Sequence, residues 1–395
     1  MLANSILTQA LIKPLDQTPD KIKYLVLSDI HLGHKRNTTR EIIHNLFLYF
    51  DNFSPESPLK DLDIVFIAGD LFDQAIWFNN EDVVRIILFI RKLMSWCEYF
   101  NIKLRILEGT PSHDRSQTRN FVPIAKGFQK LDFRYIETLC IEAFYDLGIT
   151  CLYIPDEFAG SAEEAQRLFQ EELNKVNLEK VDIAILHGMF KYQVPEIGSD
   201  RFKFDEQFFL DRVKSFINIG HVHIHSVYER ILCQGSFDRL THGEEGPKGA
   251  MLMELHPHGN SFYFVENKTA KKFKTCHIKT PDIDKAVAQV RKMADSLPDE
   301  SYLRIKATKS HPVFNVFDQI AKEYLMLSFS KITEEEANER QQLLDAQELL
   351  NIDYTPVQIH KDNIVEMIIA EVKNRNDFSS HALFNLENHL KDLIT

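Results

Sequence analysis

Apolar and polar positions along the first third of the chain fall into alternating blocks. Runs rich in β-forming residues at 22–27, 64–68 and 102–107 predict strands. Between them, apolar residues recur every three or four positions near 38–50 and 80–100, which predicts two amphipathic helices. A β-α-β-α-β order predicts a sheet that is largely parallel in this part of the chain.

The pattern changes after residue 147. Strands are expected at 148–154 and 181–186, separated by a helix whose start at Ser161 to Glu164 fits a capping box. A further strand at 216–219 is followed by hairpin-like strands at 227–233, 250–255 and 262–265. We therefore expect an α/β fold: a two-sheet sandwich with an antiparallel second half, flanked by helices.

Charge then marks two further segments. Residues 268–310 hold eleven Lys/Arg and five Asp/Glu, a net of +6, in a strand-helix-strand-helix-strand pattern that continues to 329. Residues 333–395 hold five Lys/Arg and thirteen Asp/Glu, a net of −8, with Leu/Ile stripes at helical spacing. We expect a domain at 1–266, a small basic α/β domain at 267–332, and an acidic helical segment at 333–395 that can bind a partner.

The overall composition excludes some classes of protein but does not identify a function. The 395 residues are 44% hydrophobic with a net charge of −12, which argues against nonspecific coating of nucleic acid but leaves room for local positive charge. No apolar run is long enough to span a bilayer, and the first residues lack the features of a signal peptide. Five cysteines without C-x-x-C spacing predict buried thiols in a reducing compartment, so we expect a cytoplasmic protein.

The candidate chemistry lies where the predicted strands end. The ends supply Asp and His repeatedly, with one Ser: Asp29, His31, Asp70, Asp73, Ser112, His113, Asp114, His187, His221 and His223. In an open α/β sheet, ligands bind beyond the carboxyl ends of the strands, and mixed carboxylate and imidazole donors suit Mn, Fe or Zn better than Mg or Ca.

Two divalent ions can be assigned ligands from this set. One would take Asp29, His31, Asp70 and His223, and the other Asp70, His187, His221 and the Ser112 hydroxyl. Two such ions can polarise a phosphate and activate a water for in-line attack. His113 is the candidate general acid for the leaving group, with Asp114 orienting its ring, while Asp73 is expected to be a supporting or turn carboxylate.

The five motifs together carry a resemblance. Asp29-x-His31, Gly69-Asp70-x-x-Asp73, Ser112-His113-Asp114, His187 and Gly220-His221-x-His223 resemble, in order and context, the motifs of calcineurin-like metallophosphoesterases. The segments Gly69 to Asp73, Gln234 to Arg239 and Gly243 to Gly249 look like those of the DNA-repair nuclease branch, the SbcD-like exonuclease subunits. The resemblance covers roughly residues 22–255.

This resemblance implies more than the motifs do. It implies a Mn-dependent DNA nuclease acting in repair or recombination with an SbcC-like coiled-coil ATPase, a capping domain after the phosphoesterase domain, and a homodimer. One departure is clear: the family has Gly-Asn-His-Asp at the third motif, and we expect Ser112 to stand in the place of the Asn, two extra residues lengthening the turn. A hydroxyl is a weaker donor than an amide oxygen, so the second ion should bind more loosely.

Two other functions remain open. A phosphodiesterase for a small nucleotide, or a phosphoprotein phosphatase, would keep the ions without binding DNA. A DNA-end scaffold with a weakened site is the third hypothesis, which only Ser112 supports. The basic segment and the additional domain favour the nuclease.

Overall fold

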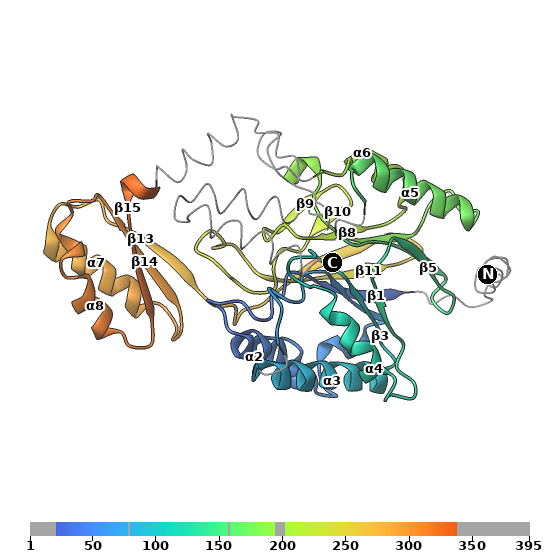
Figure 1. Ribbon diagram of the computed structural model, residues 1–395, viewed down its shortest axis with the longest axis horizontal. Helices are drawn as coiled ribbons and strands as arrows, with labels where there is room; N and C mark the ends of the chain where they lie inside the picture. Colours follow the sequence, from blue (N-terminus) through green and yellow to red (C-terminus); the bar gives the residue numbers. More distant parts are fainter. Residues whose placement is uncertain (1–20, 78–79, 157–158, 194–201, 338–395) are drawn as a thin grey trace, which may run out of the picture. The chain divides into compact units, whose positions relative to one another are not determined.

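The computed structural model describes residues 21–77, 80–156, 159–193 and 202–337, and two six-stranded sheets form its main body (Figure 1). The first sheet has the order β12-β11-β1-β2-β3-β4, with bounds Ser261–Glu266, Gly249–Leu255, Ile22–Leu27, Ile64–Ala68, Lys103–Leu107 and Phe133–Ile136. The second has the order β5-β6-β7-β8-β10-β9, with bounds Cys140–Phe144, Ile149–Ile154, Ile183–His187, Ile217–Gly220, Ile231–Cys233 and Ser226–Tyr228.

Parallel strands occupy the centre of both sheets. In the first, β1, β2, β3 and β4 run parallel, while β11 pairs antiparallel with both β1 and β12. In the second, β6, β7, β8 and β10 run parallel, with antiparallel β5 and β9 at the edges. The carboxyl ends of several parallel strands are therefore available in each sheet to carry a site.

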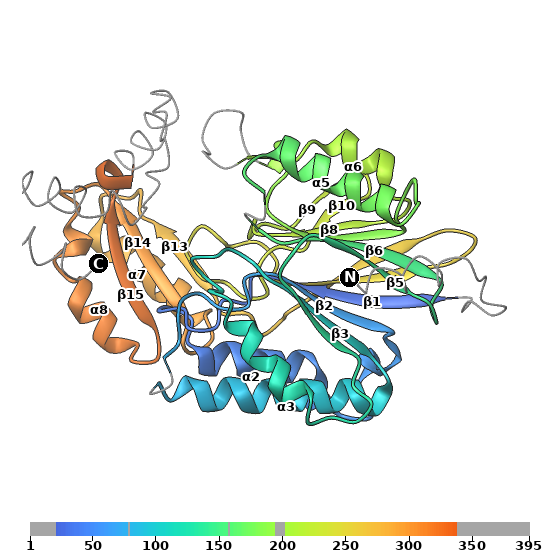
Figure 2. The same ribbon diagram turned by 45° about the vertical axis from the view of Figure 1, so that its right-hand side comes forward.

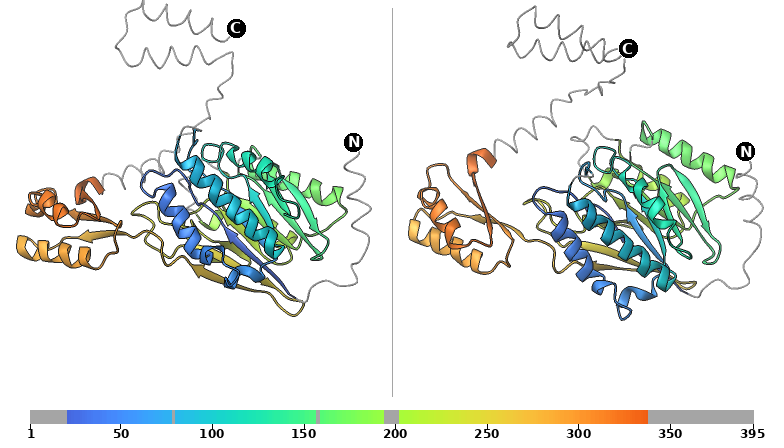
Figure 3. Two further views of the ribbon diagram at one scale, coloured as in Figure 1. Left: turned by 90° about the horizontal axis from the view of Figure 1, so that it is seen from below. Right: turned by 60° about the horizontal axis from the view of Figure 1, so that its bottom comes forward.

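Helices cover the outer faces of the two sheets (Figure 2). On the first sheet lie α2 (Thr39–Tyr49) and α3 (Asp82–Phe100), which run side by side (Figure 3), and the short α4 (Phe121–Ala125). On the second lie α5 (Ala162–Lys175) and α6 (Glu206–Arg212). Short 3-10 helices occur at Asp51–Phe53, Pro58–Asp61, Gln117–Asn120, Lys191–Gln193 and Pro312–Phe314.

The two sheets meet through a buried apolar layer. Tyr24 of β1, Phe66 of β2 and Tyr153 of β6 lie in it, with centroid separations of 5.5 Å for Tyr24–Phe66 and 6.2 Å for Phe66–Tyr153. Burial on both faces explains why the central strands are continuous apolar runs rather than alternating ones. This packing fixes the strand ends of one sheet against those of the other.

A separate three-stranded parallel sheet follows along the chain. It consists of β13 (Phe273–His277), β14 (Tyr302–Ala307) and β15 (Ser328–Thr333) in that order. The helices α7 (Ile283–Asp295) and α8 (Phe317–Glu323) pack on it around their own apolar cluster. Contacts within the chain divide it into residues 1–345 and 346–395, and the acidic segment beyond 337 lies outside the described residues.

The predicted α/β class is confirmed, with differences in detail. Strands β4 and β5 were not expected, and the antiparallel strands are shared between the edges of both sheets rather than forming one antiparallel half. The strand expected at 227–233 is the β9-β10 hairpin, broken at Glu229, whose φ is 50°. The helix expected at 312–324 is a 3-10 turn followed by α8, and β15 lies three residues later than expected.

Two further findings concern the described residues. Among them, no helix combines the length and apolar character that crossing a bilayer requires. All five cysteines are unpaired. Cys97, Cys151, Cys233 and Cys276 are buried, as the sequence predicts, whereas Cys140 is half-buried.

Candidate metal centre

The Asp and His side chains singled out from the sequence converge from both sheets. Asp29 and His31 follow β1, Asp70 follows β2, and His113 lies in the turn after β3. The second sheet supplies His187, the last residue of β7, and the pair His221 and His223, which follow β8. These residues form three overlapping groups, each with ligand atoms within 4.8 Å of one another: Asp29, His31 and His223; His31, Asp70 and His113; Asp70, His187 and His221.

The backbone at four of these positions is left-handed. Asp29, His31, Asp70 and His221 have φ values of 49°, 55°, 48° and 98°. Residues other than glycine adopt this region at a cost, and such strain clusters at functional sites. The surrounding fold therefore holds these side chains in place against their local preference.

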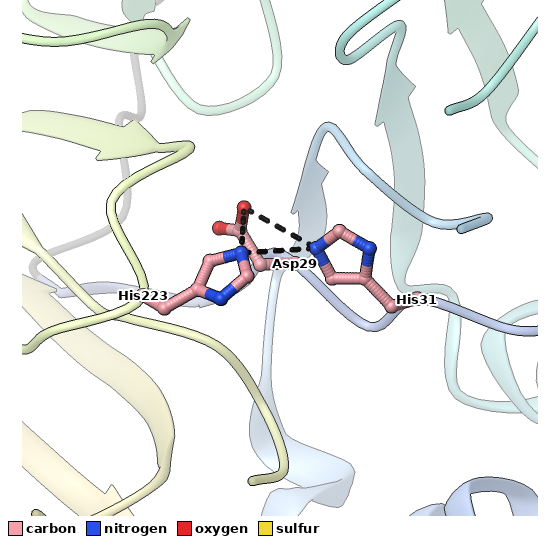
Figure 4. Close-up of side chains that lie close together, drawn as sticks. All are labelled: Asp29, His31 and His223. Atoms are coloured by element: carbon pink, nitrogen blue, oxygen red, sulfur yellow. Dashed lines mark hydrogen bonds and ion pairs between the residues drawn. The ribbon is translucent and has the colours of Figure 1, made fainter. Parts of the chain in front are cut away.

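In the first group, Asp29, His31 and His223 point toward one another (Figure 4). The Nε2 atoms of His31 and His223 are 3.0 Å apart, and Asp29 Oδ1 lies 3.6 Å from His223 Nε2 and 4.0 Å from His31 Nε2. Two nitrogens that each lie about 2.1 Å from one ion, at a right angle, are about 3.0 Å apart. The two imidazoles are thus already spaced as ligands of a common ion.

Neighbouring groups fix the orientation of these ligands. His223 Nδ1 lies 3.0 Å from Glu244 Oε1, and the other oxygen of Glu244 accepts a bond of 2.8 Å from the buried Lys248 ammonium. Asp73 Oδ1 lies 3.2 Å from His31 Nδ1, which agrees with the supporting place expected for Asp73. Carboxylates behind imidazoles favour the tautomer whose Nε2 lone pair is free to bind a metal.

Glu244 is ionised because of its partners. Burial alone would raise the pKa of its carboxyl, but the bond from His223 and the charge of Lys248 lower that pKa to about 2. Lys248 also donates to His223 O and Ser236 Oγ, at 2.8 and 2.7 Å. Glu244 and Lys248 therefore form a buried, fully bonded pair directly behind a candidate ligand.

The third group centres on Asp70 and His187. His187 Nδ1 donates to the carbonyl of Ala68 over 2.7 Å, so its Nε2 is left with a lone pair. That Nε2 is buried, has no hydrogen-bond partner, and lies 3.3 Å from Asp70 Oδ1. The other oxygen of Asp70 lies 3.8 Å from His31 Nε2 of the first group. Asp70 therefore faces both groups, which is the geometry required of a bridging carboxylate.

His113 is held by Asp70 and not by Asp114. Its Nδ1 lies 2.8 Å from Asp70 Oδ2, and this bond raises the pKa of the imidazole. The expectation that Asp114 orients the ring is wrong, because both Asp114 oxygens accept backbone bonds, from Phe72 N at 2.8 Å and Gly109 N at 2.7 Å. Asp114 is fully buried, which raises its pKa to about 8, and it fixes the turn rather than the imidazole.

Ser112 is not placed as the sequence reasoning expected. Its side chain is exposed, and its carbonyl accepts a bond from Arg115. The hydroxyl that lies among the ligands belongs to Thr110, the residue directly after Gly109 in the same turn, where the Thr110 Oγ1 is 3.2 Å from Asp70 Oδ2 and 3.4 Å from His221 Nδ1. The sequence could have indicated Thr110, because it directly follows the glycine of the motif, as the Asn of the resembled family does.

Asp156 is the acidic residue that the sequence reasoning missed. It lies two residues after β6, and its Oδ2 is 2.9 Å from Thr110 Oγ1 and 3.9 Å from His221 Nδ1. A strand end carrying Asp is the same signal that identified Asp29 and Asp70. It was overlooked because Pro155-Asp156 reads as an ordinary turn.

The donor set fits two divalent cations. The buried and unpartnered His187 Nε2, the paired Nε2 atoms of His31 and His223, and the shared Asp70 each fit ion binding. Mixed imidazole and carboxylate ligands suit Mn, Fe or Zn. The three groups are compatible with a two-metal site of the kind that hydrolyses phosphoesters.

Other motif residues have structural roles. Asp238 is buried, and its carboxylate accepts bonds from Asn45 and from the backbone N–H groups of Arg239 and Lys271. Arg239 donates to the carbonyls of Ala270, Lys271 and Gly246. The segment Gln234 to Arg239 therefore anchors the chain that leads from β12 to β13.

Among the comparisons with known proteins, only that with solved structures gives matches. No family model matches the chain, and no curated protein matches it. One solved chain is 14% identical, with a TM-score of 0.34 over 62% of this chain and 100% of that chain. Another, TT1561 of Thermus thermophilus, is 10% identical, with a TM-score of 0.32 over 62% of this chain and 98% of that chain. Such low scores assign neither a fold nor a function, so the function proposed next depends on side-chain geometry.

Proposed function

We propose that this protein is a two-metal DNA nuclease that hydrolyses phosphodiester bonds. The observation that carries the proposal is the convergence of three overlapping Asp/His groups, two of which share Asp70, at strand ends of two packed sheets. When bound there, two ions, for which we propose Mn²⁺, would polarise the phosphate and supply a water-derived nucleophile.

The side chains that would take part have separable tasks. Asp29, His31 and His223 would hold one ion, His187 and His221 would hold the other, and both ions would share Asp70. His113 donates a proton to the leaving oxygen. The side chain of His113 is 36% exposed, so it can reach a substrate, and its bond to Asp70 raises its pKa, which favours the protonated form that an acid requires.

DNA is the proposed substrate because of the motifs and the open site. His113 and His223 keep 36% and 28% of their side-chain surface exposed, which gives a backbone phosphate access. The basic run contributes less than its charge indicates, since Lys271 pairs with Glu41 and Lys274 with Glu245. An SbcC-like ATPase as the partner and homodimerisation remain proposals that depend on the resemblance.

Cleavage of end-labelled linear duplex DNA with Mn²⁺ tests the proposal. Wild-type protein should cleave it, and His113→Ala should lower the rate by about 10² to 10⁴-fold while retaining bound metal, because only the proton donor is lost. His258→Ala, which removes an exposed imidazole of the β11-β12 turn, is the matched control and should be fully active.

The same protein samples, assayed with a small phosphodiester, test the alternative that the protein is a phosphodiesterase for small substrates. Hydrolysis of bis(p-nitrophenyl) phosphate without DNA cleavage would support a phosphodiesterase for small substrates. Neither reaction, with metal bound, would support a scaffold or a subunit that needs its ATPase. Loss of metal from His113→Ala would make His113 a ligand and contradict its role as the acid.

A further inference from the structure

Two carboxylate oxygens and one imidazole nitrogen lie close to the Thr110 hydroxyl. Its Oγ1 lies 2.9 Å from Asp156 Oδ2, 3.2 Å from Asp70 Oδ2 and 3.4 Å from His221 Nδ1. A hydroxyl has one proton to donate, so it can satisfy only one of the two carboxylates. Asp70 Oδ2 already lies 2.8 Å from His113 Nδ1, so the hydroxyl proton can go to Asp156, and the lone pairs of Thr110 Oγ1 remain to bind a cation among these atoms.

The same place is buried and faces an unpartnered ligand atom. Thr110 is 1% exposed, and the side chains of Asp156 and His221 are 6% and 17% exposed. His187 Nε2, which is buried without a hydrogen-bond partner, lies 3.3 Å from Asp70 Oδ1 on this side of the site. A buried imidazole nitrogen without a hydrogen-bond partner costs free energy, and a cation bound beside it would remove that cost.

We propose that Asp156 and Thr110 are the oxygen ligands that complete the second ion site, together with Asp70, His187 and His221. This inference rests on the proposed two-metal function and adds to it. Asp156 follows β6 of the second sheet. It would supply the oxygen donor that was expected from Ser112, in the turn after β3 of the first sheet.

The proposal changes the expected chemistry of the site. Asp156 adds a third carboxylate to Asp29 and Asp70, whereas an amide would be neutral. Added carboxylate donors favour Mn²⁺ over softer ions, and their charge should tighten the second site rather than weaken it. Ser112 led us to expect a loosely bound second ion. With Asp156 as a ligand, we instead expect the second ion to be tightly bound.

Mn²⁺ binding to metal-stripped, full-length protein tests this inference. Calorimetry should give two ions per wild-type chain, and electron paramagnetic resonance should give the signal of a coupled pair. Asp156→Asn should keep one ion at unchanged affinity and weaken the other at least tenfold, within the roughly 10 to 100-fold range for loss of a supporting metal contact. Asp211→Asn, an exposed acid of α6, is the matched control and should change neither.

A second pair of variants keeps the test decisive. Thr110→Val removes only the hydroxyl and should also weaken the second ion, which decides the matter if Asp156→Asn does not fold. Ser112→Ala should have no effect. Two ions bound with wild-type affinity in both Asp156→Asn and Thr110→Val, or a second ion lost in Ser112→Ala alone, would overturn the inference.

Failure of the underlying function gives a different result. If wild-type protein binds no Mn²⁺, both the two-metal proposal and this inference are wrong. If it binds two ions, loses one in Asp156→Asn, and cleaves no DNA, the inference stands and the nuclease proposal is wrong.

Discussion

At the scale of single residues, Glu244 links stability to metal binding. It lies between His223 and the buried Lys248, with bonds to both. Removing one partner of a buried ion pair leaves the other charge uncompensated, which costs about 3–5 kcal/mol. Glu244 therefore supports the fold and the orientation of His223 at the same time.

We predict that Glu244→Gln destabilises the metal-free protein by about 3–5 kcal/mol and weakens Mn²⁺ binding at the first site. The neighbouring Glu245→Gln, whose partner is the exposed Lys274, is the control and should cost less than about 1 kcal/mol. Urea unfolding in the presence of EDTA measures both. Equal stability of the two variants would show that the buried pair does not support the fold.

The same carboxylate predicts an acid-sensitive stability. The folded pKa of Glu244 is about 2, below an unfolded value of about 4.3, so its contribution is complete above about pH 5 and is lost as pH falls toward 2. Wild-type protein should lose more unfolding free energy over this range than Glu244→Gln. Parallel slopes for the two proteins would contradict the assignment.

Protons and metal ions should compete for the site. Burial alone would lower the pKa of both His187 and His223, but Asp70 raises the pKa of His187 well above its usual range, and Glu244 and Asp29 raise that of His223. An imidazole whose Nε2 carries a proton must lose it to bind an ion, so these shifts favour proton release when metal binds. Mn²⁺ affinity should therefore rise with pH until these rings are deprotonated.

Calorimetry in two buffers of different ionisation enthalpy measures this competition. We expect protons to be released with each ion and the release to diminish as pH rises. Binding that is independent of both pH and buffer would contradict the proposed imidazole ligands.

The sequence identified the residues that form the site better than it identified the contacts that these residues make. Asp29, His31, Asp70, His187, His221 and His223 all lie in the predicted cluster, because each follows a strand with a clear apolar pattern. It erred where one turn offered two hydroxyls, since residue type does not tell which of Thr110 and Ser112 points inward. It also could not tell that Asp70, 43 residues away in sequence, would hold His113.

At the scale of elements, the site depends on close approach between strand ends. A Cβ at Gly69, where φ is 84°, would lie 2.2 Å from His187 Nδ1. Side chains other than glycine are strained at this φ, and the added atom would displace a ligand. The Gly-Asp of the second motif is therefore a steric requirement of the site.

Gly69→Ala is predicted to destabilise the fold by about 1–3 kcal/mol and to remove the ion held by His187. Gly246→Ala is the control, because a Cβ there would meet nothing within 4 Å. Thermal unfolding and Mn²⁺ content distinguish the two. Full metal content in Gly69→Ala would mean that His187 has room to move.

Element boundaries were predicted well where apolar runs are buried on both faces. The predicted bounds of β1 and β2 agree with the structure, and Ser161 caps α5 by accepting from Glu164 N. Strands β4 and β5 were missed because their residues are mostly only half-buried, so the apolar pattern is weak. The position of β4 also depends on its pairing with β3, about 30 residues earlier, whereas β5 pairs with β6, the next strand along the chain.

At the scale of the whole molecule, the fold joins two sheets whose parallel strands end at one site. Residues 338–395 lie outside the part of the chain that the structure describes. We predict that a chain ending at Asp345 keeps Mn²⁺ binding and cleavage of short DNA, but loses binding to the proposed ATPase. Metal content, cleavage and co-purification measure the three; loss of all of them would mean that the tail is part of the fold.

The central claim is a pair of metal ions at this junction, and anomalous diffraction at the Mn edge tests it most directly. Crystals grown with Mn²⁺ should give two peaks, one contacting Asp29, His31 and His223 and the other contacting Asp70, His187 and His221. No peak at these residues, or peaks only elsewhere on the molecule, would contradict the two-metal account.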